Sequence, residues 1–457
     1  MNRKPNVLIF FTDQQRWDTS SLHGNPLDLM PNFERMARRG AHFENSFTCQ
    51  PVCGPARSCL QTGQYATETG VFTNMQALDE QADTIAKYFR EAGYRTGYIG
   101  KWHLAGTRVS WHKDDQEPVP ESRRGGYEEW LAADLLEFSS DAYDTSLFNE
   151  NNERVKLPGY RVDALTDAAI RFIDRNQNDA FFLFLSFLEP HHQNTRDDYP
   201  APPGYAERYR DAWTPPDLAT LGGSTQKHLP GYYGMVKRLD ECLGRVTEAI
   251  ESLGLADDTV VLFTSDHGNH FKTRNSEYKR SPHDSSLRTP FAAQGPGFDG
   301  GGTVTELVSL VDLPPTLLDL AGIQQKTPMQ GRSLLPLVRR EATDWPDDVF
   351  AQISESQVGR VIRTRRWKYS VVAPGIDGCA QPAAEEYEEA CLYDLYADPY
   401  ELENLAGGIA FRAVADRLKE RLLSRIKTIE GATPTIRDAP ERVLPGQRVV
   451  MPEEANE

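Results

Sequence analysis

The sequence predicts an α/β protein with a large, mainly parallel sheet covered by helices, followed by a smaller antiparallel sheet that carries one helix. Four almost wholly apolar segments alternate with helical patterns, and such segments are typical of parallel strands buried on both faces. From about residue 340 the order changes, because short strand patterns precede a single helical pattern. We therefore expect a main α/β domain at 1–340 and a C-terminal subdomain at 341–457.

The elements follow from apolar periodicity and from glycines that end helices. Strands are predicted at 6–11, 95–100, 181–187 and 259–265. Helices are predicted at 31–39, 83–92, 162–175 and 232–253, with glycine following the first, second and fourth. In the C-terminal subdomain we expect two short strands within 359–372, a helix around 410–429 and an extended tail from residue 431.

Bulk properties exclude several classes of protein. The 457 residues are 39% hydrophobic and 26% charged, as in globular proteins, and no apolar run reaches the roughly 18 residues of a membrane span. A net charge of -17 disfavours nucleic acid as a partner. The N-terminus lacks a signal-peptide core, so we expect a cytoplasmic protein unless a leader has been trimmed. An oligomer is possible.

The six cysteines do not make a disulfide framework in a chain of this length. Cys379 and Cys391 bracket a loop rich in proline and glutamate and could pair, although a reduced state is favoured. Cys49, Cys53 and Cys59 lie close together in the sequence.

Polar residues follow each of the four predicted strands. The first strand runs into Asp13-Gln14, the second into Lys101-Trp102-His103, the third into Glu189-Pro190-His191 and the fourth into Asp266-His267. In parallel sheets ligands bind beyond the carboxyl ends of the strands. We therefore expect the four clusters to converge on one crevice.

Asp13, Gln14, Asp266 and His267 are candidate ligands of a divalent metal ion. Two carboxylates and an amide oxygen suit a hard cation such as Ca2+, and the histidine would also be tolerated by Mn2+. Mg2+ is a further alternative. The competing interpretation is that acidic residues merely punctuate the strand ends, but two such pairs, each directly after an apolar strand, favour the metal.

Five basic side chains form a candidate anion pocket, namely Arg57, Lys101, His103, His191 and Lys279. Lysine and arginine are usually solvated, and a histidine in a Pro-His-His loop is more often structural. The positions of Lys101, His103 and His191 at strand ends favour a function. Phosphate and sulfate need such groups to balance the charge of their oxygens.

The most informative segment is Cys53-Gly-Pro-Ala-Arg57. By itself it is also compatible with an ordinary helix start, because Pro55 suits a first-turn position. It resembles the C-x-P-x-R signature of type I, formylglycine-dependent sulfatases in the alkaline phosphatase superfamily. The strand-end clusters, the Lys279 to Pro290 block and the Leu392 to Leu405 block resemble that family's other motifs in the same order.

The resemblance implies a sulfate ester hydrolase in which a maturation enzyme oxidises Cys53 to formylglycine. It implies that the hydrated aldehyde attacks sulfur while Arg57 steadies the diol and the metal binds a sulfate oxygen. Lys101 and Lys279 would neutralise sulfate, and His191 with Lys279 would protonate the leaving alcohol. His103 would then take a proton from the second hydroxyl, which releases sulfate.

Some positions depart from the commonest family pattern. Ala56 replaces a serine, and His283 replaces a tyrosine. Gln14 and His267 replace an aspartate and an asparagine, as they also do in the branch that includes phosphonate monoester hydrolases. A phosphonate monoester or phosphodiester hydrolase therefore stays as the alternative, and an inactive binding protein on the same fold is a second, less favoured one.

The substrate is less visible in the sequence. We expect a small sulfated molecule, with a sulfated sugar as one option, and we place the crevice rims at 104–160 and 193–230. Candidate contacts share an aromatic or basic side chain in these or neighbouring loops and are Trp111, His112, Arg123, Arg124, Trp213, His228, His270 and Arg274. Ordinary solvated loop residues are the competing interpretation for each.

Overall fold

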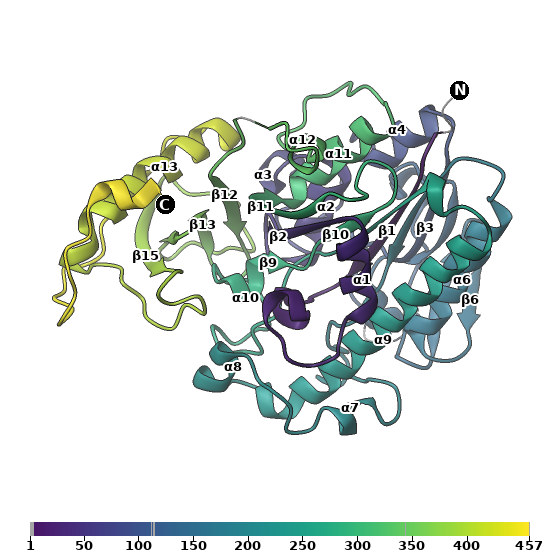
Figure 1. Cartoon of the computed structure of the whole chain (residues 1–457), viewed down its shortest axis with the longest axis horizontal. Helices are drawn as coiled ribbons and strands as arrows, with labels where there is room; N and C mark the ends of the chain where they lie inside the picture. Colours follow the sequence, from purple (N-terminus) through teal and green to yellow (C-terminus); the bar gives the residue numbers. More distant parts are fainter. Residues whose placement is uncertain (1–3, 111, 113–114, 343, 457) are drawn as a thin grey trace.

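The computed structural model describes residues 4–110, 112, 115–342 and 344–456, and it contains two sheets (Figure 1). The larger sheet has 11 strands in the order β11-β2-β10-β8-β1-β7-β3-β4-β5-β6, with β9 paired to β2. Their bounds are β1 Asn6–Thr12, β2 Ala41–Phe47, β3 Arg95–Lys101, β4 Glu129–Ala133, β5 Thr145–Asn149, β6 Arg154–Leu157, β7 Phe181–Ser186, β8 Thr259–Ser265, β9 Arg288–Thr289, β10 Ala292–Gln294 and β11 Gly302–Ser309. The predicted α/β class is confirmed.

The four predicted strands are neighbours at the centre of this sheet. They form the parallel order β8-β1-β7-β3, and every residue of β1, β7 and β8 is buried. The two-sided burial explains their continuous apolar sequences. Because all four run in one direction, their carboxyl ends lie on the same edge of the sheet.

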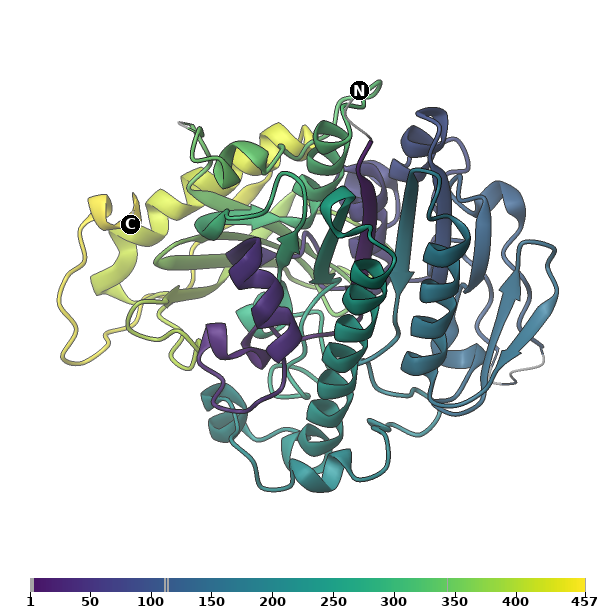
Figure 2. The ribbon, with the colours of Figure 1, turned by 45° about the vertical axis from the view of Figure 1, so that its right-hand side comes forward.

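Helices cover both faces of the sheet, as two hydrophobic clusters show. Val7, Ile9 and Phe11 of β1 point toward the face covered by α2, α4 and α11, whereas Leu8 and Phe10 point toward α1, α6 and α9. Helices α6 and α9 lie side by side across that second face (Figure 2). The bounds are α1 Pro31–Arg39, α2 Cys53–Thr62, α3 Ala66–Thr69, α4 Ile85–Glu91, α5 Leu136–Ser139, α6 Arg161–Arg175, α7 Tyr205–Arg208, α8 Pro216–Leu221, α9 Thr225–Ser252, α10 Asp284–Leu287, α11 Leu313–Leu320, α12 Leu335–Val338 and α13 Arg412–Glu430. Within the described residues no helix is both long and apolar enough to cross a lipid bilayer.

The predicted start of the long helix at residue 232 is wrong. Helix α9 begins at Thr225 and contains Pro230, which the sequence pattern treats as a break. The proline removes one backbone hydrogen bond near the helix start, while buried neighbours such as Leu229 and Tyr232 hold the turn against the sheet. Tertiary packing therefore outweighs the local preference.

Strands β2, β6 and β10, which lie outside the central four, were not predicted, and the reason is physical. Strand β2 has the sequence AHFENSF and β6 has RVKL, so neither shows the apolar run of a central strand. Strand β10 has only three residues and runs antiparallel to both β8 and β2. Such elements depend on neighbouring strands that are distant in the sequence.

The second sheet has the order β12-β13-β14-β15-β16, with bounds β12 Asp348–Ile353, β13 Val358–Thr364, β14 Trp367–Ala373, β15 Glu386–Asp394 and β16 Thr435–Arg437. Its first four strands are antiparallel, and helix α13 packs on β13 and β14 (Figure 1). The two strands within 359–372 and the helix near 410–429 are confirmed. The tail from residue 431 includes the extended strand β16, as expected, but it ends in a short 3-10 helix, Pro452–Asn456, that was not predicted. The Glu454 carbonyl of this helix accepts from the Trp367 indole at 2.6 Å.

Gly100 gives a direct test of the packing between β3 and β7. It has a φ of 111°, and a Cβ atom there would lie 1.8 Å from the Ser186 carbonyl oxygen. We expect Gly100→Ala to lower the free energy of unfolding by more than about 3 kcal/mol, because the strands would have to separate. Gly159→Ala is the matched control, since Gly159 has a φ of 83° and open space around it. It should cost only about 1–2 kcal/mol. Equal losses in urea titrations would contradict the packing argument.

Candidate active site

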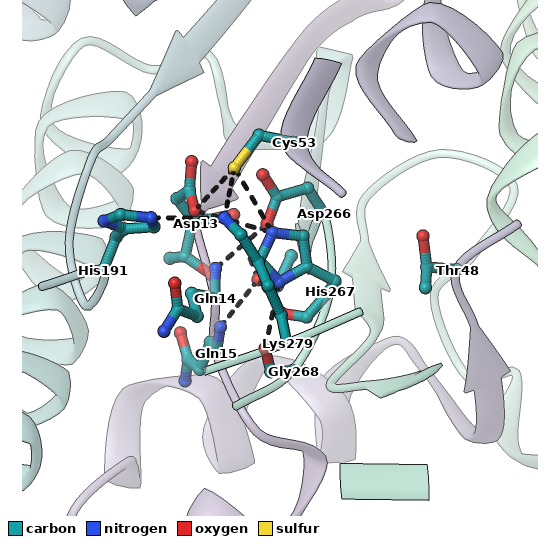
Figure 3. A network of polar contacts seen from close by, with 12 residues as sticks. Asp13, Gln14, Gln15, Thr48, Cys53, His191, Asp266, His267, Gly268 and Lys279 are labelled. Atoms are coloured by element: carbon teal, nitrogen blue, oxygen red, sulfur yellow. Dashed lines mark hydrogen bonds and ion pairs between the residues drawn. The ribbon is translucent and has the colours of Figure 1, made fainter. Parts of the chain in front are cut away.

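The polar clusters at the four strand ends converge as expected, and Figure 3 shows the residues that follow β1, β7 and β8. Asp13 directly follows β1, Lys101 ends β3, His191 follows β7 and Asp266 directly follows β8. These side chains are buried and surround the sulfur of Cys53, the first residue of α2. The sheet edge predicted from the direction of the strands therefore holds one compact, buried polar site.

Cys53 lies at the centre of the site. Its Sγ is 2.8 Å from Lys279 Nζ, 3.3 Å from His267 Nε2 and 3.5 Å from Asp13 Oδ1. Burial would raise the pKa of the thiol, but Lys101, Lys279 and His267 together hold it well below its usual range. The position at the start of a helix also favours negative charge. The site is therefore built around an anionic group at residue 53.

Three of the four predicted metal ligands, Asp13, Asp266 and His267, lie beside this sulfur. Single ligand atoms of Asp13, Cys53, Asp266 and His267 lie within 4.8 Å of one another. Nδ1 of His267 is 2.9 Å from the Gly268 carbonyl, which assigns the hydrogen to Nδ1 and leaves the Nε2 lone pair facing the carboxylates. The Oε1 atom of Gln14 is buried and accepts no hydrogen bond from the described residues. An unpaired amide oxygen beside two carboxylates fits a hard divalent cation.

The pKa values of the two carboxylates shift in opposite directions. Burial and the nearby Asp13 raise the pKa of Asp266 to about 6. Asp13 has its pKa lowered, because Lys101, His191 and Arg57 outweigh both its burial and the charge on Cys53. Two buried carboxylates this close need positive charge between them to stay ionised together. A bound divalent ion would supply it.

Arg57 lies one turn along α2 and binds both buried carboxylates. One nitrogen of its guanidinium donates to Asp13 at 2.9 Å and to Asp266 at 3.2 Å, and the other donates to the Lys101 carbonyl and to Ser186, each at 2.8 Å. The structure gives it no hydrogen bond to Cys53. These bonds let Arg57 hold the candidate metal carboxylates, and the expectation that it steadies the diol stays a prediction.

Lys101 is fully buried and engaged by two carboxylates. Its Nζ is 2.9 Å from Asp13 Oδ2 and 3.0 Å from Glu137 Oε1. Burial alone would lower the pKa of Lys101, but Asp13 and the other nearby negative groups raise it above its ordinary value. Glu137 Oε1 also lies 3.8 Å from Nδ1 of His103. The carboxylate thus joins the two basic residues that follow β3.

His191 and Lys279 form a pair on the other side of Cys53. Nδ1 of His191 is 2.7 Å from the His192 carbonyl, so it carries the hydrogen, and Nε2 accepts from Lys279 Nζ at 3.2 Å. Burial and the ammonium of Lys279 lower the pKa of His191. A proton can therefore be held between these two groups next to the position of the nucleophile.

Two residues at the site carry no sequence signal of their own. Glu137 lies on the four-residue helix α5, and Asn74 lies in a loop, where its Oδ1 accepts from the Gly54 N–H at 2.9 Å. A lone glutamate and a lone asparagine are usually solvated. Only the packing of these segments against α2 and β3 gives them a function.

Most of the predicted rim contacts have structural partners instead. Arg124 donates to the Val119 and Glu150 carbonyls, His270 to the Lys279 carbonyl and Arg274 to the Tyr400 and Glu401 carbonyls. His228 is buried against Tyr278, and Arg123 forms an ion pair with Glu80. His112 is exposed, the Trp213 carbonyl accepts from Tyr233, and Trp111 lies outside the described residues.

Comparison with known proteins agrees with this site. A family model described as Sulfatase matches residues 5–323, and one described as N-sulphoglucosamine sulphohydrolase, C-terminal, matches residues 276–428. The chain is 29% identical over 445 residues to an ulvan-active sulfatase of Formosa agariphila, covering 93% of this chain and 81% of that protein. It is 25% identical over 537 residues to an N-acetylglucosamine-6-O-sulfatase of Bacteroides thetaiotaomicron, covering 98% and 90%.

The fold has a close match among solved structures. The crystal structure of a Bacteroides fragilis protein assigned as the sulfatase yidJ superposes with a TM-score of 0.80 at 24% identity, covering 93% of this chain and 96% of that one. The family model alone spans well over half of the chain. The chain therefore belongs to the sulfatase family of the alkaline phosphatase superfamily and is a sulfuric ester hydrolase, a class that works with formylglycine and a divalent metal ion.

Proposed function

We propose that this enzyme releases sulfate from a sulfated carbohydrate, with formylglycine formed from Cys53 as nucleophile and Ca2+ as the metal. The observation that carries the proposal is the position of the Cys53 sulfur, which touches Lys279 on one side and His267 and Asp13 on the other. The sulfur in the structure marks the position that a hydroxyl of the hydrated aldehyde would take in the mature enzyme. A nucleophile in this place faces both an anion pocket and a metal site.

The ligand set for the metal would be Asp13, Gln14, Asp266 and His267. Three of the four offer oxygen, which favours Ca2+ over softer ions, while His267 keeps Mn2+ as an alternative and Mg2+ is a further one. When bound, the ion would balance charge on the sulfate and favour the ionised nucleophile. Arg57 bridges Asp13 and Asp266 and would keep them in place for it.

The residues around position 53 divide the acid and base work. The aldehyde hydrate supplies one hydroxyl that attacks and a second whose deprotonation lets sulfate leave. Lys279 donates to the attacking position and to His191, so this pair can neutralise the sulfate and deliver a proton to the departing alcohol oxygen. His103, on the other side, can take the proton of the second hydroxyl while Glu137 stabilises its charged form.

A carbohydrate is supported by the relatives. One relative is named for ulvan and another for N-acetylglucosamine 6-O-sulfate, and the model that matches 276–428 is named for N-sulphoglucosamine. The alternative, a phosphonate monoester or phosphodiester hydrolase, draws on Gln14 and His267. It also draws on the likeness to a phosphonate monoester hydrolase of Agrobacterium radiobacter, which superposes with a TM-score of 0.67 at 25% identity and covers 92% of this chain and 95% of that one. Parallel assays of sulfated monosaccharides, 4-nitrophenyl sulfate and phenyl phosphonate esters separate the two. Faster turnover of the phosphonate ester would overturn the proposal.

Replacing the nucleophile tests the maturation of Cys53 by an oxidising enzyme. We expect Cys53→Ala to abolish sulfate release, because no other group replaces the aldehyde hydrate. Mass spectrometry of the wild-type peptide from a host with the maturation enzyme should show an aldehyde in place of the thiol. The control is Cys59→Ala, because Cys59 lies on the same helix but in the hydrophobic core. Full sulfate release by Cys53→Ala would disprove the assignment.

Removing one oxygen tests the metal site. Gln14→Leu keeps the approximate side-chain volume but deletes Oε1, so we expect the affinity for Ca2+ to fall by at least about tenfold in isothermal titration. Gln15→Leu is the matched control, since the Gln15 amide donates away from the site to Thr19 at 3.1 Å. Equal affinities in the two variants would remove Gln14 from the ligand set.

A further inference from the structure

The turn between β12 and β13 of the small sheet reaches into the surroundings of the active site. Its residue Glu355 has a side chain that is only 11% exposed. One carboxylate oxygen accepts from the Asn74 N–H at 2.7 Å, and the other forms an ion pair with the guanidinium of Arg280. One carboxylate from the second sheet thus joins two segments of the main domain.

The Asn74 contact leads to the nucleophile. The side-chain oxygen of Asn74 accepts from the N–H of Gly54, the residue next to Cys53. This N–H lies in the first turn of α2, where no helical carbonyl is available to it. A Cβ atom on Gly54 would also lie 3.3 Å from the His103 carbonyl, so the helix start is closely packed. Glu355 therefore holds the segment that fixes the start of the nucleophile helix.

The Arg280 contact leads to Lys279. Arg280 has a φ of 68°, a backbone conformation that is unfavourable for residues other than glycine and that persists only where its surroundings impose it. The hydroxyl of Ser356, next to Glu355, donates to the Arg280 carbonyl at 2.6 Å. The turn therefore binds both the side chain and the backbone carbonyl of Arg280. These two contacts fix the backbone next to Lys279 and so the direction of its side chain.

A second link ties the same loop to the small sheet. Lys368 of β14 forms ion pairs with Asp284 and Glu401, and Arg363 of β13 lies 3.4 Å from the Asp284 carboxylate. Asp284 begins α10, four residues after Arg280. The segment that carries Lys279 is thus held by the small sheet at two points.

We propose that Glu355 is a positioning residue that sets the separation of residue 53 and Lys279, which is 2.8 Å between Sγ and Nζ in the structure. The proposal rests on the function proposed above, in which these two groups act on the sulfate. It assigns the small sheet a part in catalysis without any contact to the reacting atoms. Misplacing a reacting pair by about 1 Å is enough to cost up to about a hundredfold in rate.

Glu355→Gln tests the proposal, with Glu277→Gln as the matched control. Glu277 is the other carboxylate on Arg280, at 2.9 Å, but its side chain is 50% exposed. We expect Glu355→Gln to lower kcat for sulfate release by about tenfold to a hundredfold with KM changed less than about threefold, and Glu277→Gln to match the wild type. Formylglycine content, measured on each batch, must be equal across the variants.

Arg280→Gln gives a second approach to the same contact. It should lower kcat similarly, and the double variant should lose no more than either single one, since the two residues act as a unit. Losses that multiply in the double variant would overturn the inference, as would a Glu355→Gln enzyme as fast as Glu277→Gln. If Glu355→Gln fails to fold, Arg280→Gln compared with Glu277→Gln decides. A wild-type enzyme that releases no sulfate would overturn the proposed function and this inference together.

Discussion

The site depends on two carboxylates that the sheet places side by side. Strands β1 and β8 pair in parallel with Thr12 opposite Ser265, so the next residues of both strands are Asp13 and Asp266. Both are buried, and neither can move away without breaking the ladder between the strands. Two negative charges confined in this way need nearby positive charge. Arg57 supplies part of that charge, and a bound metal ion would supply the rest.

The other polar groups follow from the same constraint. Lys101, at the end of β3, forms ion pairs with both Asp13 and Glu137. Glu137 in turn lies beside His103. His191 and Lys279 line the opposite side of the nucleophile. The two sides of the site thus differ in charge balance. The positive charges of one side are paired with carboxylates. On the other side, the hydrogen-bond partners of Lys279 Nζ among the described residues are the Cys53 sulfur and the His191 imidazole. In the proposed mechanism, an incoming sulfate would supply the missing negative charge on the second side.

The sequence was sufficient for those parts whose signal is local. Four apolar runs identified the centre of the sheet, and the polar residues after them identified Asp13, Lys101, His191 and Asp266 as neighbours in space. The motif at 53–57 identified Cys53, but not the orientation of Arg57, which depends on strands β1 and β8 meeting beneath α2. Glu137, Asn74 and Glu355 were not predictable, because each is an ordinary polar residue on a short or irregular segment. The start of α9 and the three-residue strand β10 were missed because packing, not local preference, determines them.

Burial of Cys53 has a consequence for how the enzyme is made. Only 1% of the residue is exposed, and it lies under the closed surroundings of α2, the Asn74 loop and the Lys279 loop. Any protein that modifies this side chain must reach it before these segments come together. In the proposed maturation, folding and the oxidation of Cys53 would therefore compete in time, and a chain that folds first would keep its thiol. The active fraction of a preparation would then record the order of events during synthesis rather than the stability of the finished protein.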